Sequence, residues 1–95
     1  MKLSKRVYQF VRFKKSKAKN KKYSAILKNK QTGRTVTVNF GDSRYEQYKD
    51  NTGLGIYSHL NHNDKKRRSH YKSRHKIHLN AGYYSPAYFS YKYLW

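Results

Sequence analysis

Residues 23–40, which read YSAILKNKQTGRTVTVNF, have the clearest secondary-structure pattern in the chain. Hydrophobic residues recur at every second position in both halves of this stretch, at Tyr23, Ala25, Leu27, Val36, Val38 and Phe40. Such alternation is typical of strands that bury one face. The intervening residues 29–33 are polar and end in a glycine that can adopt a positive φ. The stretch therefore predicts a β-hairpin, whose apolar face must be covered because an isolated hairpin is only marginally stable.

Capping residues after the hairpin predict three short helices, over about 43–49, 64–76 and 86–95. Ser43 with Glu46 resembles a capping box, and Asp64 places a carboxylate at the N-terminus of the second helix. Ser85 and Pro86 are an N-cap followed by proline at the first helical position. The predicted fold class is α+β, with a single small domain over 23–95.

The first 22 residues contain ten Lys and Arg and no Asp or Glu. Their apolar residues Val7, Val11 and Phe13 fit a strand, whereas Leu3, Val7, Phe10 and Val11 fit a helix, so periodicity leaves both open. From 14 to 22 the one apolar residue is Ala18. This segment predicts an extended basic N-terminal arm over 1–22, separate from the domain.

The amino-acid composition and net charge indicate which kind of partner the protein binds. The chain has 95 residues and a formal net charge of +19, and Leu, Ile, Val and Phe make up only 17 positions. So thin a core, under strong self-repulsion, favours a chain that is stabilised by a polyanion or by acidic faces of neighbouring proteins. Cysteine is absent, and no apolar run is long enough for a signal peptide or a membrane span.

Catalysis is not predicted. The four carboxylates, Asp42, Glu46, Asp50 and Asp64, are better explained as helix caps or ion-pair partners than as a general acid–base pair. Histidines beside Lys65 to Arg68 make a poor site for a dication. We therefore expect no catalytic residue, metal site, cofactor or small-molecule substrate.

Cations interleaved with aromatic residues are the main binding feature. Lys and Arg release counterions from nucleic acid, and Tyr and His stack on exposed bases. The residues expected to bind nucleic acid or an acidic partner are Lys14, Lys15, Lys17, Lys19, Lys21, Lys22, Arg67, Arg68, Tyr71, Arg74 and His75. No motif that reads base sequence is present.

The predicted terminal helix is aromatic nearly all round. A helix without a polar face is either buried or an interface. Because Tyr, Trp and Arg dominate protein–protein contacts, we expect a protein interface there. It consists of Tyr88, Phe89, Tyr91, Tyr93, Leu94 and Trp95.

The chain resembles a family of small basic proteins encoded by large double-stranded DNA viruses of algae and protists, with distant similarity to proteins of some tailed phages. The resemblance covers roughly 23–95, and this chain differs from the pattern at 51–63 and 76–82. It rests on Thr32, Gly33, Arg34, Val36, Val38, Phe40, Gly41, Tyr45, Tyr48, Asp64, Arg67, Arg68, Tyr71, Arg74, His75, Leu94 and Trp95. The resemblance implies a viral setting rather than a mechanism.

These features together predict a minor, capsid-associated structural protein of a large DNA virus particle, which bridges or cements neighbouring shell proteins. Its partners would be other virion proteins, and its location the virion. The alternative is a sequence-independent protein that binds or condenses nucleic acid through the DNA or RNA backbone, as a virion DNA-binding or ribosomal-type basic protein does.

Overall fold

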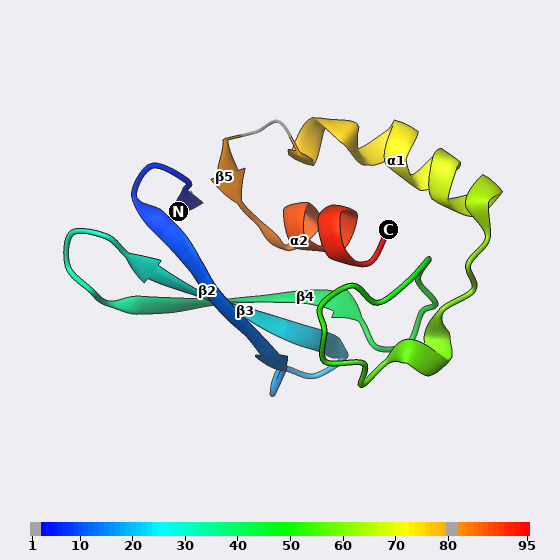
Figure 1. The fold of residues 1–95 in the computed structure, drawn as a ribbon, viewed down its shortest axis with the longest axis horizontal. Helices are drawn as coiled ribbons and strands as arrows, with labels where there is room; N and C mark the ends of the chain where they lie inside the picture. Colours follow the sequence, from blue (N-terminus) through cyan, green and yellow to red (C-terminus); the bar gives the residue numbers. More distant parts are fainter. Residues whose placement is uncertain (1–2, 80–81) are drawn as a thin grey trace.

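A three-stranded antiparallel sheet in the order β2-β3-β4 forms the base of the molecule (Figure 1). The computed structural model describes residues 3–79 and 82–95. Its elements in chain order are β1 (Leu3–Ser4), β2 (Tyr8–Lys15), β3 (Lys21–Asn29), β4 (Thr35–Asp42), the 3₁₀ turn η1 (Ser58–Leu60), α1 (Lys65–Leu79), β5 (Tyr83–Tyr84) and α2 (Pro86–Tyr93). The predicted α+β class is confirmed.

The predicted hairpin is confirmed as β3 and β4. Tyr23 lies opposite Phe40, and Leu27 lies opposite Val36, so the alternating apolar residues share one face. Asn29 closes the turn through its side chain, whose Oδ1 accepts hydrogen bonds from the backbone N–H groups of Gln31 and Thr32. Gly33 has φ +75°, the left-handed conformation that the turn requires.

The basic arm is a wrong prediction for residues 8–15, which form β2 and pair with β3. Phe10 lies opposite Leu27 and Phe13 opposite Ala25, with a bulge between Phe10 and Arg12 that keeps both rings on the core face. Strand pairing uses backbone groups, and the lysine side chains of β2 are free to extend into solvent. Residues 1 and 2 of the predicted arm lie outside the described residues.

Two of the three predicted helices are confirmed, and each has the predicted cap. Asp64 Oδ1 accepts from the N–H groups of Lys66 and Arg67 at the start of α1. Ser85 Oγ accepts from the N–H of Tyr88 at the start of α2. Neither helix, over the described residues, has the length and apolar character needed to cross a bilayer.

The helix predicted at 43–49 is wrong. Gly41 and Asp42 continue β4, and the Asp42 carboxylate then holds a turn by accepting from the backbone and side chain of Arg44. Gln47 is fully buried, and its amide donates to Tyr57 O at 2.9 Å and to Asn61 Oδ1 at 2.7 Å. These long-range hydrogen bonds and the Gln47–Asn61 bridge hold residues 43–49 in turns and bends, and they outweigh the local helix signals.

The core is aromatic rather than aliphatic. Phe89 of α2 is 1% exposed and lies 5.4 Å from the Phe40 ring and 6.0 Å from the Phe13 ring, centroid to centroid. Tyr23 and Leu94 are buried in the same cluster. Large rings thus supply the apolar area that the few aliphatic residues cannot.

The molecule has three layers, in which α2 packs on one face of the sheet and α1 lies outside α2 (Figure 1). The chain start is tied to this arrangement by β1, which pairs with β5 directly before α2. The opposite face of the sheet carries neither helix. The candidate site lies on this open face of the sheet.

Candidate nucleic-acid interface

The open face of the sheet carries cations on β2 and β3 and hydroxyl groups on β4. Arg12, Lys14 and Lys28 are exposed on it, as are Thr35 and Thr37. The strand register places them in rows: Arg12 lies beside Ile26, which lies beside Thr37, and Lys28 lies beside Thr35. The alternation that turns apolar residues toward α2 therefore turns these polar residues to solvent.

A second row on this face is joined by hydrogen bonds. Lys14 lies beside Ser24, and Ser24 beside Asn39. Asn39 Oδ1 accepts from Ser16 Oγ at 2.8 Å and from Ser24 Oγ at 2.6 Å. Since its oxygen is occupied by these two hydroxyls, the asparagine has its amide N–H groups left to offer a ligand.

A hollow of about 210 Å³ opens in this row, lined in part by Lys14, Lys17, Thr37 and Asn39. Two ammonium groups, a hydroxyl and an amide are all donors to an anionic oxygen. We define the basic sheet face as Arg12, Lys14, Lys17 and Lys28 with Ser24, Thr37 and Asn39.

The turn between β2 and β3 extends this positive surface. Lys15, Lys17, Lys19 and Lys21 are exposed there, as the sequence predicts for a binding segment. Residues 8–41 contain ten Lys and Arg and no Asp or Glu. With no carboxylate in the sheet before Asp42, the turn and the basic sheet face share one sign of charge.

Lys22 is the exception among the predicted binding lysines, because it is only 2% exposed. Its Nζ donates to Tyr45 O at 2.8 Å and to Gln47 Oε1 at 2.6 Å. Burial lowers the pKa of this amine to about 8, against the attraction of Asp42 and Asp50. Lys22 therefore anchors the loop after β4 and is not a surface cation.

The predicted cluster on α1 divides between two roles. Arg68 Nε donates to the backbone oxygen of Trp95 at 2.7 Å, and its guanidinium lies 4.7 Å from the Tyr48 ring. Tyr71 stacks on Trp95 with ring centroids 4.3 Å apart, and the His75 ring lies 4.4 Å from Tyr71. Arg68 and Tyr71 therefore join α1 to the C-terminal residues and the loop after β4, whereas the His75 contact lies within α1.

The other two predicted arginines of α1 reach solvent. Arg67 pairs with Glu46 at 3.2 Å across an exposed surface, which leaves it only weakly held. Arg74 is exposed, as are Lys65, Lys66 and Lys76. We call these four residues, Lys65, Lys66, Arg74 and Lys76, the basic helix face.

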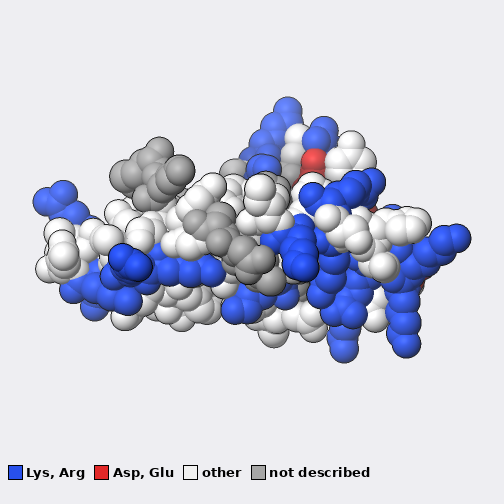
Figure 2. All heavy atoms as spheres, turned by 90° about the horizontal axis from the view of Figure 1, so that it is seen from above, with Lys and Arg blue, Asp and Glu red and all other residues white. Residues whose placement is uncertain are grey.

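The basic helix face lies on the α1 side of the molecule, opposite the basic sheet face. Figure 2 looks onto this side and shows Lys and Arg atoms along its whole length, with a small area of Asp and Glu. The protein is therefore positive on both outer layers.

The predicted protein interface on α2 is inside the molecule. Tyr88, Phe89, Tyr91 and Leu94 are buried against the sheet and α1. Tyr93 and Trp95 are partly buried and pack on the same cluster. The aromatic helix covers the hairpin of its own chain, and the four buried side chains are not a docking surface in this structure.

Buried polar groups beside the sheet serve the fold. The Tyr23 hydroxyl donates to Asp50 and accepts from the N–H of Tyr57. Burial and the Asp50 contact raise the pKa of Tyr23 to about 12. Among residues 3–79 and 82–95, no group of three or more His, Asp or Glu side chains gathers as metal ligands would.

Sequence reasoning missed Arg12, Lys28, Thr37 and Asn39 as members of one surface. The signal was present in the period-two pattern of 8–15, which puts Arg12 and Lys14 on the face opposite Phe13. This pattern identifies a shared surface only together with the pairing of β2 to β3, because that pairing aligns the three strands side by side.

The fold and site together define a small basic α+β protein with an open-faced antiparallel sheet. Residues 11–51 match the model of a family of unknown function, DUF5754. The matched segment contains β3, β4 and most of β2, and with them the basic sheet face. Comparison with curated proteins and with solved structures finds no match.

Proposed function

We propose that this protein binds nucleic acid through the phosphate backbone, without reading the base sequence. The observation that carries the proposal is the basic sheet face, where Arg12, Lys14 and Lys28 lie on β2 and β3 and the hydroxyl and amide donors Thr37 and Asn39 lie on β4, on the other side of β3 from β2. Lys, Arg, Ser, Thr and Asn side chains are the usual donors to phosphate oxygens.

The shape of the surface supports backbone binding over base reading. Neighbouring strands lie about 4.8 Å apart, so cations on adjacent strands form a flat array rather than a ridge that enters a groove. The exposed outer side of α1 carries lysines and Arg74 but no Asn or Gln that would read a base edge.

Positive surfaces on two opposite layers further support condensation. A molecule that engages one nucleic-acid segment with the basic sheet face presents the basic helix face to a second segment. Bridging of this kind draws segments together once counterions are released.

The test compares two variants with equal loss of charge. In the sheet variant Arg12, Lys14, Lys17 and Lys28 become Gln; in the helix variant Lys65, Lys66, Arg74 and Lys76 become Gln. Affinity for random duplex DNA is measured at several salt concentrations between about 50 and 200 mM. The sheet variant should lose about three to four units from the slope of log K against log salt, at roughly 0.9 per phosphate contact.

The helix variant should keep a stable complex with one duplex but lose bridging, which light scattering and sedimentation with long DNA measure. An unchanged salt slope in the sheet variant, or a strong preference for one base sequence, would contradict the proposal.

A capsid-associated role is the second candidate. Leu54 and Ile56 are exposed apolar side chains on the loop before η1, and Ile77 is exposed near the end of α1. These residues, unlike the buried aromatics of α2, are available to shell proteins. Particles opened and washed free of genome in high salt would retain the protein under this role and lose it under nucleic-acid binding.

A further inference from the structure

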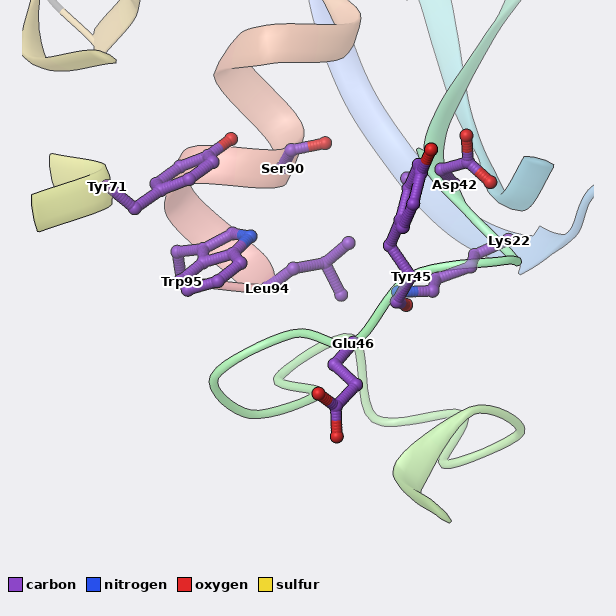
Figure 3. Close-up of a pocket in the computed structure, with 9 residues that line it drawn as sticks. Lys22, Asp42, Tyr45, Glu46, Tyr71, Ser90, Leu94 and Trp95 are labelled. Carbon is purple, nitrogen blue, oxygen red and sulfur yellow. The ribbon is translucent and has the colours of Figure 1, made fainter. Parts of the chain in front are cut away.

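A second hollow, of about 260 Å³, lies on the α2 side of the sheet and is walled by aromatic rings (Figure 3). Tyr71 and Trp95 stand on one side of it and Tyr45 on the other, with Ser90 and Leu94 between them. The volume is slightly below the roughly 300–1,000 Å³ typical of drug-sized ligands, so it suits a single ring system.

The Tyr71–Trp95 wall is held in place by ring stacking and by a hydrogen bond to the backbone. The two rings are parallel to within 7° at 4.3 Å, and Arg68 holds the Trp95 backbone from the other helix. Leu94 is buried beneath them. Gly41 completes the floor with φ +73°, and a Cβ there would lie 2.9 Å from Leu94 Cδ1. The hollow is therefore built from four separate parts of the chain: Lys22 of β3, residues 41–46, Tyr71 of α1 and residues 90–95.

Tyr45 faces this wall and is unusual in this protein. Its side chain is among the most exposed large hydrophobic ones, at 64%, whereas most rings near it are packed. Its backbone is nonetheless fixed, because its carbonyl accepts from the buried Lys22 ammonium. An aromatic ring held by its backbone at the mouth of an aromatic hollow is placed to stack on a flat ligand.

Polar groups around the hollow offer both donors and acceptors. The Ser90 hydroxyl points toward its interior. The rim carboxylates are each paired with an arginine, Asp42 with Arg44 at 2.8 Å and Glu46 with Arg67 at 3.2 Å. Both guanidinium groups are exposed and can meet the phosphates that flank a bound base.

We propose that this hollow takes one unpaired nucleobase, which stacks on Tyr45 against the Tyr71–Trp95 wall and hydrogen-bonds with Ser90. The inference rests on the proposed backbone binding and adds a preference for single-stranded over duplex nucleic acid. Every base has a π-face, so this stacking does not select a sequence.

The chain offers its own probe, because Trp95 is its only tryptophan. The experiment titrates the full-length protein with two single-stranded oligonucleotides of equal length, one with thymine bases and one with abasic sugars throughout. Both carry the same phosphates and release the same counterions. We expect the thymine strand to quench Trp95 fluorescence and to bind about tenfold or more tightly than the abasic strand.

Two variants localise the effect. Tyr45→Ala removes an exposed ring and should abolish the preference for the thymine strand while leaving the salt slope unchanged. Tyr45→Phe keeps the ring and should keep the preference. Equal affinity for the two strands with no quenching would overturn the base pocket and leave the backbone proposal standing. Failure of both strands to bind would contradict both proposals.

Discussion

Lys22 provides a stability prediction whose size follows from its burial. The folded protein holds this amine at a pKa of about 8, compared with 10.5 for a solvated lysine. Below pH 8 the amine is charged in both the folded and the unfolded chain, so its contribution does not change with pH. Between pH 8 and 10.5 the unfolded chain holds a proton that the folded chain has lost, and the free energy of unfolding rises with pH.

The expected rise has an upper bound of about 3–4 kcal/mol, since the pKa differs by about 2.5 units between the two states and each unit corresponds to about 1.4 kcal/mol. Tyr23 acts in the opposite direction at higher pH. Its pKa is raised to about 12 from 10.0, so above pH 10 the unfolded chain loses a proton that the folded chain keeps. We therefore expect stability to peak near pH 10.

The assay is urea denaturation at constant ionic strength at pH 7, 8, 9 and 10, on wild type and on Lys22→Met. Methionine has a similar length and does not titrate, and the solvated lysines titrate alike in both proteins. The variant should lack the additional rise of the wild type above pH 8. Parallel stability curves for the two proteins between pH 8 and 10 would refute the assignment of a depressed pKa to Lys22. Side-chain NMR of Lys22 provides the same answer independently of folding.

Three further perturbations have expected outcomes. Gly41→Ala should lower the free energy of unfolding, measured by urea denaturation, by about 1–3 kcal/mol or more, because the new Cβ would sit at a positive φ and 2.9 Å from Leu94 Cδ1. Gly53→Ala is the control: its Cβ would meet no neighbouring atom, so the variant should be destabilised only by the backbone strain of a φ of +85°. Phe89→Ala should cost about 3–5 kcal/mol in thermal unfolding, since it empties the centre of the aromatic core; a loss below about 1 kcal/mol would place the core elsewhere. Burial, followed by the charge of Arg67, lowers the pKa of His62, so the unfolded chain takes up a proton below about pH 6.5 before the folded chain does. Stability should therefore fall between pH 7 and 5 in the wild type and fall less in His62→Gln.

The elements predicted correctly are those with local causes. The hairpin follows from alternation and a turn within residues 23–40, and the starts of α1 and α2 follow from caps that bond to N–H groups two or three residues away. Each of these signals is complete within one short segment. The structure of these segments could therefore be predicted without knowing which residues pack against them.

The failed predictions have non-local causes. The apolar residues of 8–15 fit two periods, and pairing with Leu27 and Ala25 decides between them. The segment 43–49 carries helix caps, but Gln47 is held by Tyr57 and Asn61. The candidate site also depends on non-local contacts. Lys21 and Lys22 are neighbours in the sequence, and no local feature indicates that Lys22 is buried and Lys21 exposed.

The net charge of +19, the alternation over 23–40, the helix caps at Asp64 and Ser85, and the absence of Asp and Glu from residues 8–41 all follow from the sequence alone. These are properties of composition and of neighbouring positions, and they set the class of partner. Tertiary contacts were needed to establish which cations reach solvent, which aromatic residues form the core and which rings line a hollow. Burial depends on contacts between segments far apart in the chain, and the same Lys, Tyr or Trp is a ligand group or a structural group according to those contacts alone.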